Sequence, residues 1–215
     1  MVQEQVRVGA GASATRRRTG GESSARVHAK REKRREEILH AALRAFRARG
    51  YHATTLDDIA EGLGVRKTAL YHYFPDKEAI LHACHRESLA ELDRITRGAR
   101  RLPTVPERLR HIIREHVRVM IHTLEGSPLA FEVTALSAEH QAEIIAARDR
   151  YERFMRRLID QGIREGAFRA VHSKVAAFAV LGAINWIARW YRPEGDLAAG
   201  ELGEEFADHL VRGLM

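Results

Sequence analysis

Two short stretches of helical pattern with a glycine between them constrain the fold more than any other part of the chain. Thr55 is a residue type that caps helix starts, and Asp58 follows three positions later, which predicts a helix over 56–63. Gly64 supplies a turn, and a second short helix is predicted over 67–74, where a proline stops it. Two short helices joined by a turn that contains glycine are typical of a helix-turn-helix unit.

The second of these helices is predicted to have a polar outer face. Val65 and Leu70 are expected to anchor it on the core, and Tyr73 and Phe74 are interpreted as further core aromatics. The remaining side chains combine two cations, two hydroxyl groups and an imidazole. This set suits a helix that lies in a major groove, reads base edges and grips phosphates. The outward residues are Arg66, Lys67, Thr68, Tyr71 and His72.

The rest of the chain also carries helical periodicity. Its 215 residues are 45% hydrophobic and include only five prolines, and no convincing period-2 strand pattern occurs. We therefore predict an all-α fold of about nine helices, with a helix-turn-helix head and a larger helical-bundle body. Gly50 is expected to end a helix in left-handed conformation, and Asp76 to cap the long helix that joins head and body. The predicted divisions are a disordered basic tail (1–28), a helix-turn-helix DNA-binding domain (29–77) and a larger helical domain (78–215).

Positive charge is concentrated at the start of the chain. The formal net charge is +7, and residues 1–35 account for it with ten Lys/Arg against three Asp/Glu. A basic arm of this kind is attracted to phosphate backbones without reading sequence. A solvated tail without function is an equally open interpretation. A basic protein that coats DNA non-specifically is a further alternative, although the remainder of the chain carries no net charge.

Residues 34–82 resemble the DNA-binding domain of the TetR family of transcriptional regulators. The matched positions occur in order along the chain: Ile38, Ala42, Phe46, Gly50, Thr54, Thr55, Leu56, Ile59, Ala60, Gly64, Val65, Leu70, Tyr71, His72, Tyr73, Phe74, Lys77, Glu78 and Leu81.

The resemblance implies a role for each site residue. Thr55 should cap its helix and touch a backbone phosphate, and Lys77 should hold a phosphate at the start of the next helix. The bases should be approached by Arg66, Lys67 and Thr68, while Tyr71 and His72 should contact phosphates or a thymine methyl group. Arg66 stands where a small capping residue is usual and Thr68 where glycine is frequent, so the operator sequence is left open.

The C-terminal helices are the expected dimerisation surfaces. Residues 175–188 are apolar except for Gly182 and Asn185, and Leu202 to Leu214 repeats apolar residues at four-residue steps. In the TetR family the last two helices of each chain usually pair as a four-helix bundle, which implies a homodimer on a palindromic double-stranded DNA operator. The alternative is that both segments fill the core of one chain.

The C-terminal stretch 182–195 resembles the TetR branch that governs fatty-acid and steroid catabolism. Members of that branch include repressors released by acyl-coenzyme A thioesters. The resemblance therefore implies repression, a ligand-binding and dimerisation domain over 78–215 and a small-molecule effector of this type, with no cofactor. Asn185, Trp186 and Arg189 are the predicted ligand-binding residues, because an Asn and an Arg in an apolar wall need polar partners. Arg189 could instead pair with an acidic residue. Activation, or release by another hydrophobic ligand as in efflux regulators, stays open.

Other function classes find little support. The sequence has no Gly-rich phosphate loop and no nucleophile elbow, so no enzyme is predicted. His82, Cys84 and His85 are neighbours in sequence, but His82 and Cys84 should lie on different helix faces, so no metal site is expected. A single cysteine and the lack of an apolar run of about 20 residues predict a cytoplasmic protein without a membrane span.

Overall fold

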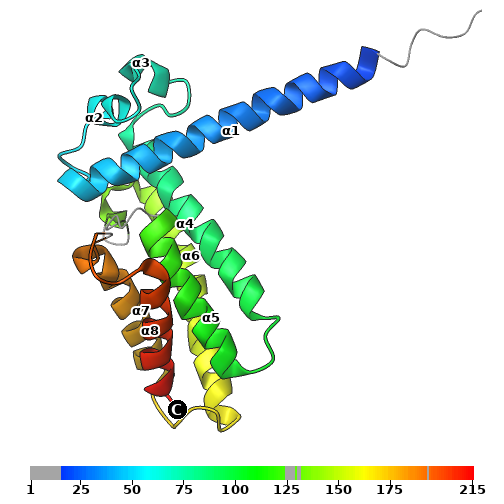
Figure 1. Cartoon of the computed structure of the whole chain (residues 1–215), viewed down its shortest axis with the longest axis vertical. Coiled ribbons are helices and arrows are strands. Elements are labelled where there is room, and N and C mark those ends of the chain that lie inside the picture. Colours follow the sequence, from blue (N-terminus) through cyan, green and yellow to red (C-terminus); the bar gives the residue numbers. More distant parts are fainter. Residues whose placement is uncertain (1–15, 124–128, 130–131, 193) are drawn as a thin grey trace, which may run out of the picture. The chain divides into compact units, whose positions relative to one another are not determined.

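The computed structural model describes residues 16–123, 129, 132–192 and 194–215, and within these ranges the chain is helical without strands, as predicted. Residues up to Glu37 and residues from Ile38 onward form two separate compact units, and each is described by itself. The α-helices (Figure 1) are α1 (Arg16–Arg49), α2 (Leu56–Glu61), α3 (Lys67–Leu70), α4 (Lys77–Ala99), α5 (Val105–Arg118), α6 (Ala138–Arg164), α7 (Ser173–Trp190) and α8 (Ala199–Arg212). A π-turn, η1 (Val119–Thr123), continues α5, and a 3-10 turn, η3 (Val133–Ala135), precedes α6.

The first helix begins earlier than the sequence pattern indicated. A disordered tail was expected over 1–28, but α1 starts at Arg16, so that prediction is wrong for residues 16–28; residues 1–15 lie outside the described part. The physical reason is cooperativity, because each residue added to an existing helix gains a hydrogen bond without a new nucleation step. The sequence of this stretch lacks the apolar period that sequence reasoning relies on.

The head has the architecture that its sequence predicted. Gly50 ends α1 with φ +77° and Gly64 makes the turn between α2 and α3 with φ +63°, both in the left-handed region that favours glycine. The helix α3 is shorter than the predicted range 67–74: it ends at Leu70, and the residues that follow form a turn. The core beneath these helices is fully buried and includes Ile38, Ala42, Phe46, Ile59, Leu70 and Phe74.

The fourth helix connects the head to the body. Asp76 caps it by accepting a hydrogen bond of 2.7 Å from the backbone N–H of Ala79, as expected. Ile80 and Leu81 at its start are buried with the head, and Leu92 and Ile95 are buried farther along. Figure 1 shows that α4 runs from the head along the body as one helix. A change in the position of one end is therefore transmitted to the other.

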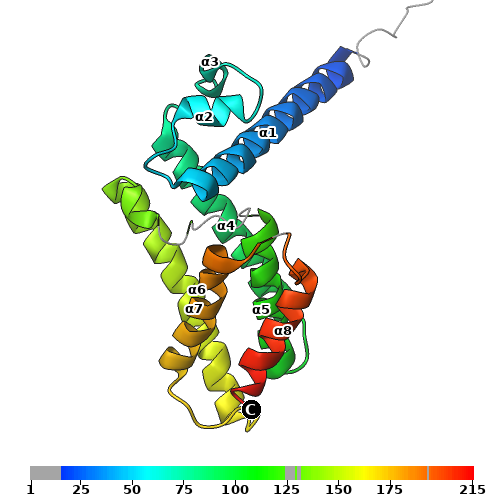
Figure 2. The same ribbon diagram turned by 60° about the vertical axis from the view of Figure 1, so that its left-hand side comes forward.

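The body is a bundle of α4 to α8. In Figure 2, α7 lies beside α6 and α8 beside α5. The contact between α8 and α5 is close because Gly203 faces Arg114, where an added Cβ would lie 3.3 Å from the Arg114 carbonyl oxygen. Ion pairs reinforce it, and one joins Arg114 to Glu204 at 3.2 Å. After the C-terminal end of α6, Gly166 adopts φ +72° and ends the helix as predicted.

Candidate DNA-binding surface and effector cavity

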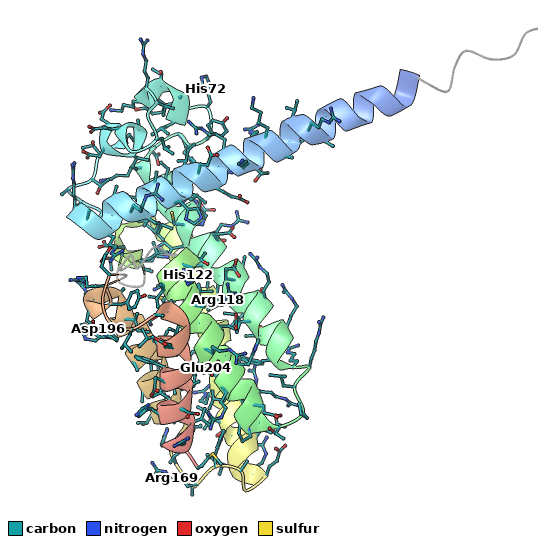
Figure 3. All side chains as sticks on the ribbon, viewed as in Figure 1. His72, Arg118, His122, Arg169, Asp196 and Glu204 are labelled. Carbon is teal, nitrogen blue, oxygen red and sulfur yellow. The ribbon has the colours of Figure 1, made fainter. Side chains whose placement is uncertain are left out.

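The outer face of α3 is exposed as the sequence predicted. Arg66, Thr68, Tyr71 and His72 are exposed, and Tyr71 presents half of its surface although it is a large aromatic residue. Figure 3 places His72 with α3 in the head, away from the bundle. Leu70 is buried directly beneath them, so the helix has one anchored side and one free side. This arrangement leaves polar side chains available for a DNA groove.

Thr55 forms the predicted capping box. Its hydroxyl oxygen accepts from the backbone N–H of Asp58 at 3.2 Å, and Asp58 accepts from the Thr55 backbone N–H at 2.7 Å. Asp58 also pairs with Arg49 at the end of α1. Hydrogen bonds from Thr55, first from its backbone and then from its side chain, lower the pKa of Asp58 together with the charge of Arg49. The cap thus fixes the start of α2 against α1.

Lys67 is held by the helix that precedes it. Its ammonium lies 3.0 Å from the carboxylate of Asp57, and the hydrogen bond and charge of Asp57 raise the pKa of Lys67. Arg66, one position earlier, is the N-cap of α3 and provides no side-chain cap, as its residue type predicted. The ammonium of Lys67 therefore points toward α2, at one edge of the exposed face of α3.

Lys77 has a different setting from the one its sequence position suggested. Its ammonium donates to the carbonyl oxygens of Tyr51, His52 and Thr54 at 2.8, 3.3 and 2.7 Å, and it lies 4.3 Å from the centre of the Tyr51 ring. A lysine has three N–H donors, and these carbonyls use all of them in this structure. Partial burial lowers the pKa of Lys77. The geometry makes Lys77 a tie between α4 and the turn after α1.

A cavity of about 340 Å³ lies inside the body. It is lined by residues of α4, the end of α5, η1, α6 and α7, together with Leu129. Its apolar wall combines Leu89, Leu92, Met120, Leu129, Phe178 and Leu181, and its polar wall combines His85, Ser88, His116, Arg148, Asp149, Tyr151, Glu152 and Asn185. An apolar hollow with a few polar groups is the usual form of a small-molecule site.

Of the three predicted ligand residues, only Asn185 lines this cavity. Trp186 and Arg189 lie on the exposed side of α7, so the expectation of an arginine within an apolar wall is wrong for Arg189. The helical period of 3.6 residues turns Trp186 away from Asn185. Arg189 lies one turn farther along α7, beyond Asn185, which is the last residue of this helix that lines the cavity. The continuous apolar run in the sequence hid the difference between the two sides of α7, because one apolar side of this helix is left exposed by the described part of the chain.

The uncovered side of α7 is an apolar stripe. Val175, Phe178, Trp186 and Trp190 are 65%, 55%, 58% and 41% exposed, and Gly182 lies among them on the same side. Contiguous exposed apolar residues of this size mark interaction sites. We call this set the α7 stripe.

The last helix uses its apolar residues differently. Leu202 and Leu214 are buried within the chain, so they fill the monomer core, and Phe206 and Leu210 are only partly covered. Phe206 stacks with Trp190 at 6.4 Å between ring centres and thereby touches the edge of the α7 stripe. The alternative of core filling thus applies to part of α8.

The polar wall of the cavity contains two buried histidines that the sequence prediction missed. His85 Nδ1 lies 3.3 Å from Nη2 of Arg148, and burial first, then the charges of Arg148 and His82, lower the pKa of His85 to about 3. His116 Nδ1 lies 3.2 Å from the hydroxyl of Tyr151, and burial lowers the pKa of His116 to about 4. Both are neutral at physiological pH. No sequence signal could identify them, because their partners lie on another helix.

A second hollow of about 570 Å³ lies between α4 and α6 and is rich in arginine. Leu89, Leu92 and Tyr151 belong to both this groove and the cavity, so the two hollows adjoin. Two acidic residues of the wall, Asp93 and Glu143, interrupt the positive charge, and Arg100 lies over the ring of Phe154 at 5.6 Å. The arginines of this groove are Arg86, Arg100, Arg150, Arg153 and Arg157.

Neither a metal site nor a membrane span occurs in the described ranges. His82 and His140 stack at 3.7 Å, yet each is paired with a glutamate, and no cluster of the described residues could hold a metal ion. Cys84 is buried, and burial raises the pKa of its thiol. None of the helices, as far as their residues are described, is long and apolar enough to cross a bilayer.

Comparison with known proteins assigns the family. The profile of bacterial regulatory proteins of the tetR family matches residues 38–84, and the profile of a tetracyclin repressor-like C-terminal domain matches residues 103–214. The chain belongs to the TetR family. Both halves of this TetR-family regulator, the head and the body, are therefore accounted for.

Several relatives match the TetR-family chain over most of their length. The HTH-type transcriptional repressor KstR2 of Mycobacterium tuberculosis is 30% identical over 200 residues, which cover 88% of this chain and 96% of KstR2. The structure of KstR2, a ketosteroid transcriptional regulator, aligns with a TM-score of 0.77 at 28% identity over 85% of this chain and 95% of that one.

Two further solved structures show the same fold. AibR, in complex with isovaleryl coenzyme A and operator DNA, aligns with a TM-score of 0.72 at 29% identity over 84% of this chain and 97% of that one. PfmR of Thermus thermophilus aligns with a TM-score of 0.73 at 34% identity over 83% of this chain and 98% of that one.

Proposed function

We propose that this TetR-family repressor acts as a homodimer that leaves its operator when an acyl-coenzyme A thioester binds in the body. One observation carries the choice of effector: an apolar cavity with a polar wall adjoins a groove lined by five arginines. A coenzyme A thioester has the same division, since its acyl group is largely apolar and its nucleotide end carries phosphates, which arginine binds well. The similarity to AibR, whose structure contains isovaleryl coenzyme A, supports the same class.

The proposed DNA contacts come from the exposed face of α3 and its flanks. We assign base contacts to Arg66, Lys67 and Thr68, contacts to phosphates or a thymine methyl to Tyr71 and His72, and a phosphate contact to Thr55. Lys77 acts indirectly, because its ammonium holds the turn at Tyr51 against α4. Binding should fall steeply with salt, since it rests on cations near phosphates.

The proposed dimer forms through the α7 stripe. Two heads must reach successive turns of the major groove, about 34–36 Å apart, and a symmetric pairing of the bodies provides this spacing. Trp186 and Phe178 are the apolar anchors on each protomer, and Gly182 between them would let the two helices approach closely. In this arrangement Phe178 serves both surfaces, because it also lines the mouth of the cavity. Trp186 and Arg189 could then contact an effector only beside the dimer interface.

The proposed switch is the position of α4. His85, Ser88, Leu89 and Leu92 of α4 form part of the cavity wall, and the same helix begins at the head with Lys77. A thioester releases the operator if it binds more tightly to a conformation in which α4 is tilted. In that conformation the distance between the two recognition helices no longer matches the spacing of successive major grooves. The coupling must be reciprocal, so operator DNA should weaken thioester binding by the same factor.

Two measurements test the proposal together. The protein is first used to select its operator from random duplex DNA, and release is then followed by fluorescence anisotropy. A panel of coenzyme A thioesters, from short branched to polycyclic acyl groups, is compared with the free acids and coenzyme A alone. We expect one thioester class to raise the melting temperature and to release the operator. The variant Tyr71→Ala should keep the thermal shift and lose operator binding. If no thioester binds, or if thioesters bind without releasing DNA, the proposed effector is wrong.

A further inference from the structure

The cavity wall contains two buried polar atoms that lack partners within the described structure. They are Nε2 of His85 and Oε1 of Glu152. His85 is 1% exposed, and both residues line the cavity. A buried polar atom without a hydrogen bond is costly, so such atoms point to a missing partner.

The hydrogen bond to Arg148 determines which nitrogen of His85 carries the proton. A guanidinium only donates hydrogen bonds, so His85 Nδ1, 3.3 Å from Arg148 Nη2, must accept. Burial lowers the pKa of His85 to about 3, so the ring is neutral and has one proton. That proton therefore resides on Nε2. The unpaired atom of His85 is a donor and needs an acceptor oxygen.

Glu152 presents the opposite requirement. It lies four residues after Arg148 on α6, so the two side chains share one helix face. Its buried Oε1 accepts hydrogen bonds and needs an N–H or O–H partner. The cavity wall also contains Asp149, so two carboxylates and one guanidinium, that of Arg148, line the cavity. A carboxylate ligand would meet this negative charge, whereas an uncharged carbonyl would not.

We infer that His85 and Glu152 form a polar clamp for the thioester end of the effector: His85 Nε2–H donates to the thioester carbonyl oxygen, and Glu152 accepts from an amide N–H of the pantetheine arm. The inference rests on the proposed function, because it names how the same cavity recognises its ligand. It also defines the ligand chemistry: an uncharged carbonyl beside a hydrogen-bond donor, with an apolar group against Leu92, Met120 and Leu181. Free acids are rejected by the carboxylates of the same wall.

The decisive experiment compares a thioester with its thioether. The tightest thioester of the panel is paired with the S-alkyl coenzyme A of the same carbon skeleton, which lacks only the carbonyl oxygen. Calorimetry on the full chain should give about tenfold weaker binding for the thioether, the usual effect of one buried hydrogen bond lost. His85→Leu should remove this difference by weakening the thioester alone. His85→Gln, whose side-chain amide can donate from a similar place, should retain most of it.

Glu152 provides an independent arm. Its partner lies on the pantetheine arm, which both ligands possess, so Glu152→Met should weaken thioester and thioether equally, on the order of tenfold. A histidine-selective ¹⁵N spectrum gives a readout beyond affinity, since the Nε2 proton of His85 should move downfield when the thioester binds and not when the thioether binds.

The outcomes separate the two proposals. If no thioester binds the wild-type protein, the proposed function fails and the clamp fails with it. If thioesters bind but the thioether binds equally well, only the clamp is overturned, and ordered water must satisfy His85. If His85→Leu does not fold, the difference in affinity between the thioester and the thioether, measured on the wild-type protein and on His85→Gln, still tests the clamp.

Discussion

The carboxylate of Glu78 lies 2.8 Å from Nδ1 of His140, which ties the first turn of α4 to the first turn of α6. Glu78 also accepts from the backbone N–H of Ser137 at 3.0 Å, and His82 on the same side of α4 pairs with Glu143 at 2.9 Å. The helix that carries the head is thus fastened to the helix that carries Arg148. These pairs belong to the part of the molecule that must move if α4 changes its tilt.

The Glu78–His140 pair should make stability depend on pH. The hydrogen bond that His140 donates to Glu78 raises the pKa of His140 above 6.5, so its contribution is complete below pH 6.5 and is lost as pH rises through the raised value. Burial opposes ionised Glu78, but hydrogen bonds from His140 and Ser137 outweigh it and lower the pKa below 4.5, so the contribution disappears again in acid. His140→Gln should therefore lower the melting temperature most between pH 4.5 and 6.5. A melting-temperature difference that stays constant up to pH 9 would contradict this, and His209→Gln is the exposed control.

His116 should make the fold sensitive to acid. Burial lowers the pKa of His116 from 6.5 to about 4. As the pH falls from 6.5 to 4, the unfolded chain therefore binds a proton at this histidine that the native chain does not bind. The free energy of unfolding should fall by about 1.4 kcal/mol per pH unit for this one group. Denaturant titrations at pH 4.5 to 7 measure the slope, and His116→Gln should reduce it by one proton. His52→Gln, which changes an exposed histidine, should leave the slope unchanged.

Removal of Asp57 should strengthen DNA binding. The ion pair restrains Lys67 and places an exposed carboxylate beside the recognition surface. Asp57→Asn frees the ammonium of Lys67 for the DNA and removes a negative charge beside it, so operator affinity should rise and the salt dependence should steepen by about 0.9 in the log–log slope, as for one further uncompensated cation at the phosphate backbone. Anisotropy titrations at several salt concentrations provide this slope. Glu61→Gln removes a carboxylate from the same helix without freeing a lysine, and an identical effect there would refute the role of the pair.

Lys77→Met should destabilise the head. The substitution leaves three carbonyl oxygens, two of them part-buried, without their donor, at a cost of about 1–3 kcal/mol. Lys77→Arg should lose less, because it retains the charge. Chemical denaturation measures the loss, with Lys33→Met as the exposed control. If Lys77→Met keeps full stability but loses operator binding, the result would favour the direct phosphate contact that the family resemblance implies for Lys77.

Trp186→Glu should separate the protomers. A charge in the centre of the α7 stripe cannot be buried against a second copy, so light scattering should report a monomer that retains its helical circular dichroism. Operator binding should fall at least a hundredfold because one head is left for each molecule. Ile145→Glu places the same charge at another exposed apolar residue and should leave the dimer intact.

The sequence predicted the head in more detail than the body. Capping residues and left-handed glycines act locally, so Thr55, Gly50, Gly64 and Asp76 could be assigned without knowledge of the fold. The all-α class and the connecting helix followed from periodicity in the same way. The long extension of α1 did not, because helix propagation leaves no apolar pattern when the helix is exposed.

The cavity could not be derived from sequence because it depends on which faces of distant helices meet. The apolar run of α7 concealed its two sides: of the three residues predicted to bind the ligand, Asn185 lines the cavity, while Trp186 and Arg189 are exposed outside it. His85 and Glu152 were missed because each is notable only through the partner it lacks in space. The hydrogen bonds of Lys77 to the carbonyls of the turn could not be predicted either, since those carbonyl oxygens converge only after the turn has formed.

The α7 stripe has a consequence for genetics. A protomer with a disabled α3 but an intact stripe would still combine with wild-type protomers, and each mixed dimer would carry a single working head. At equal expression, half of all dimers would be mixed and a quarter wholly wild type. Alleles that damage the head should therefore be dominant over the wild type, whereas alleles that damage the stripe should be recessive.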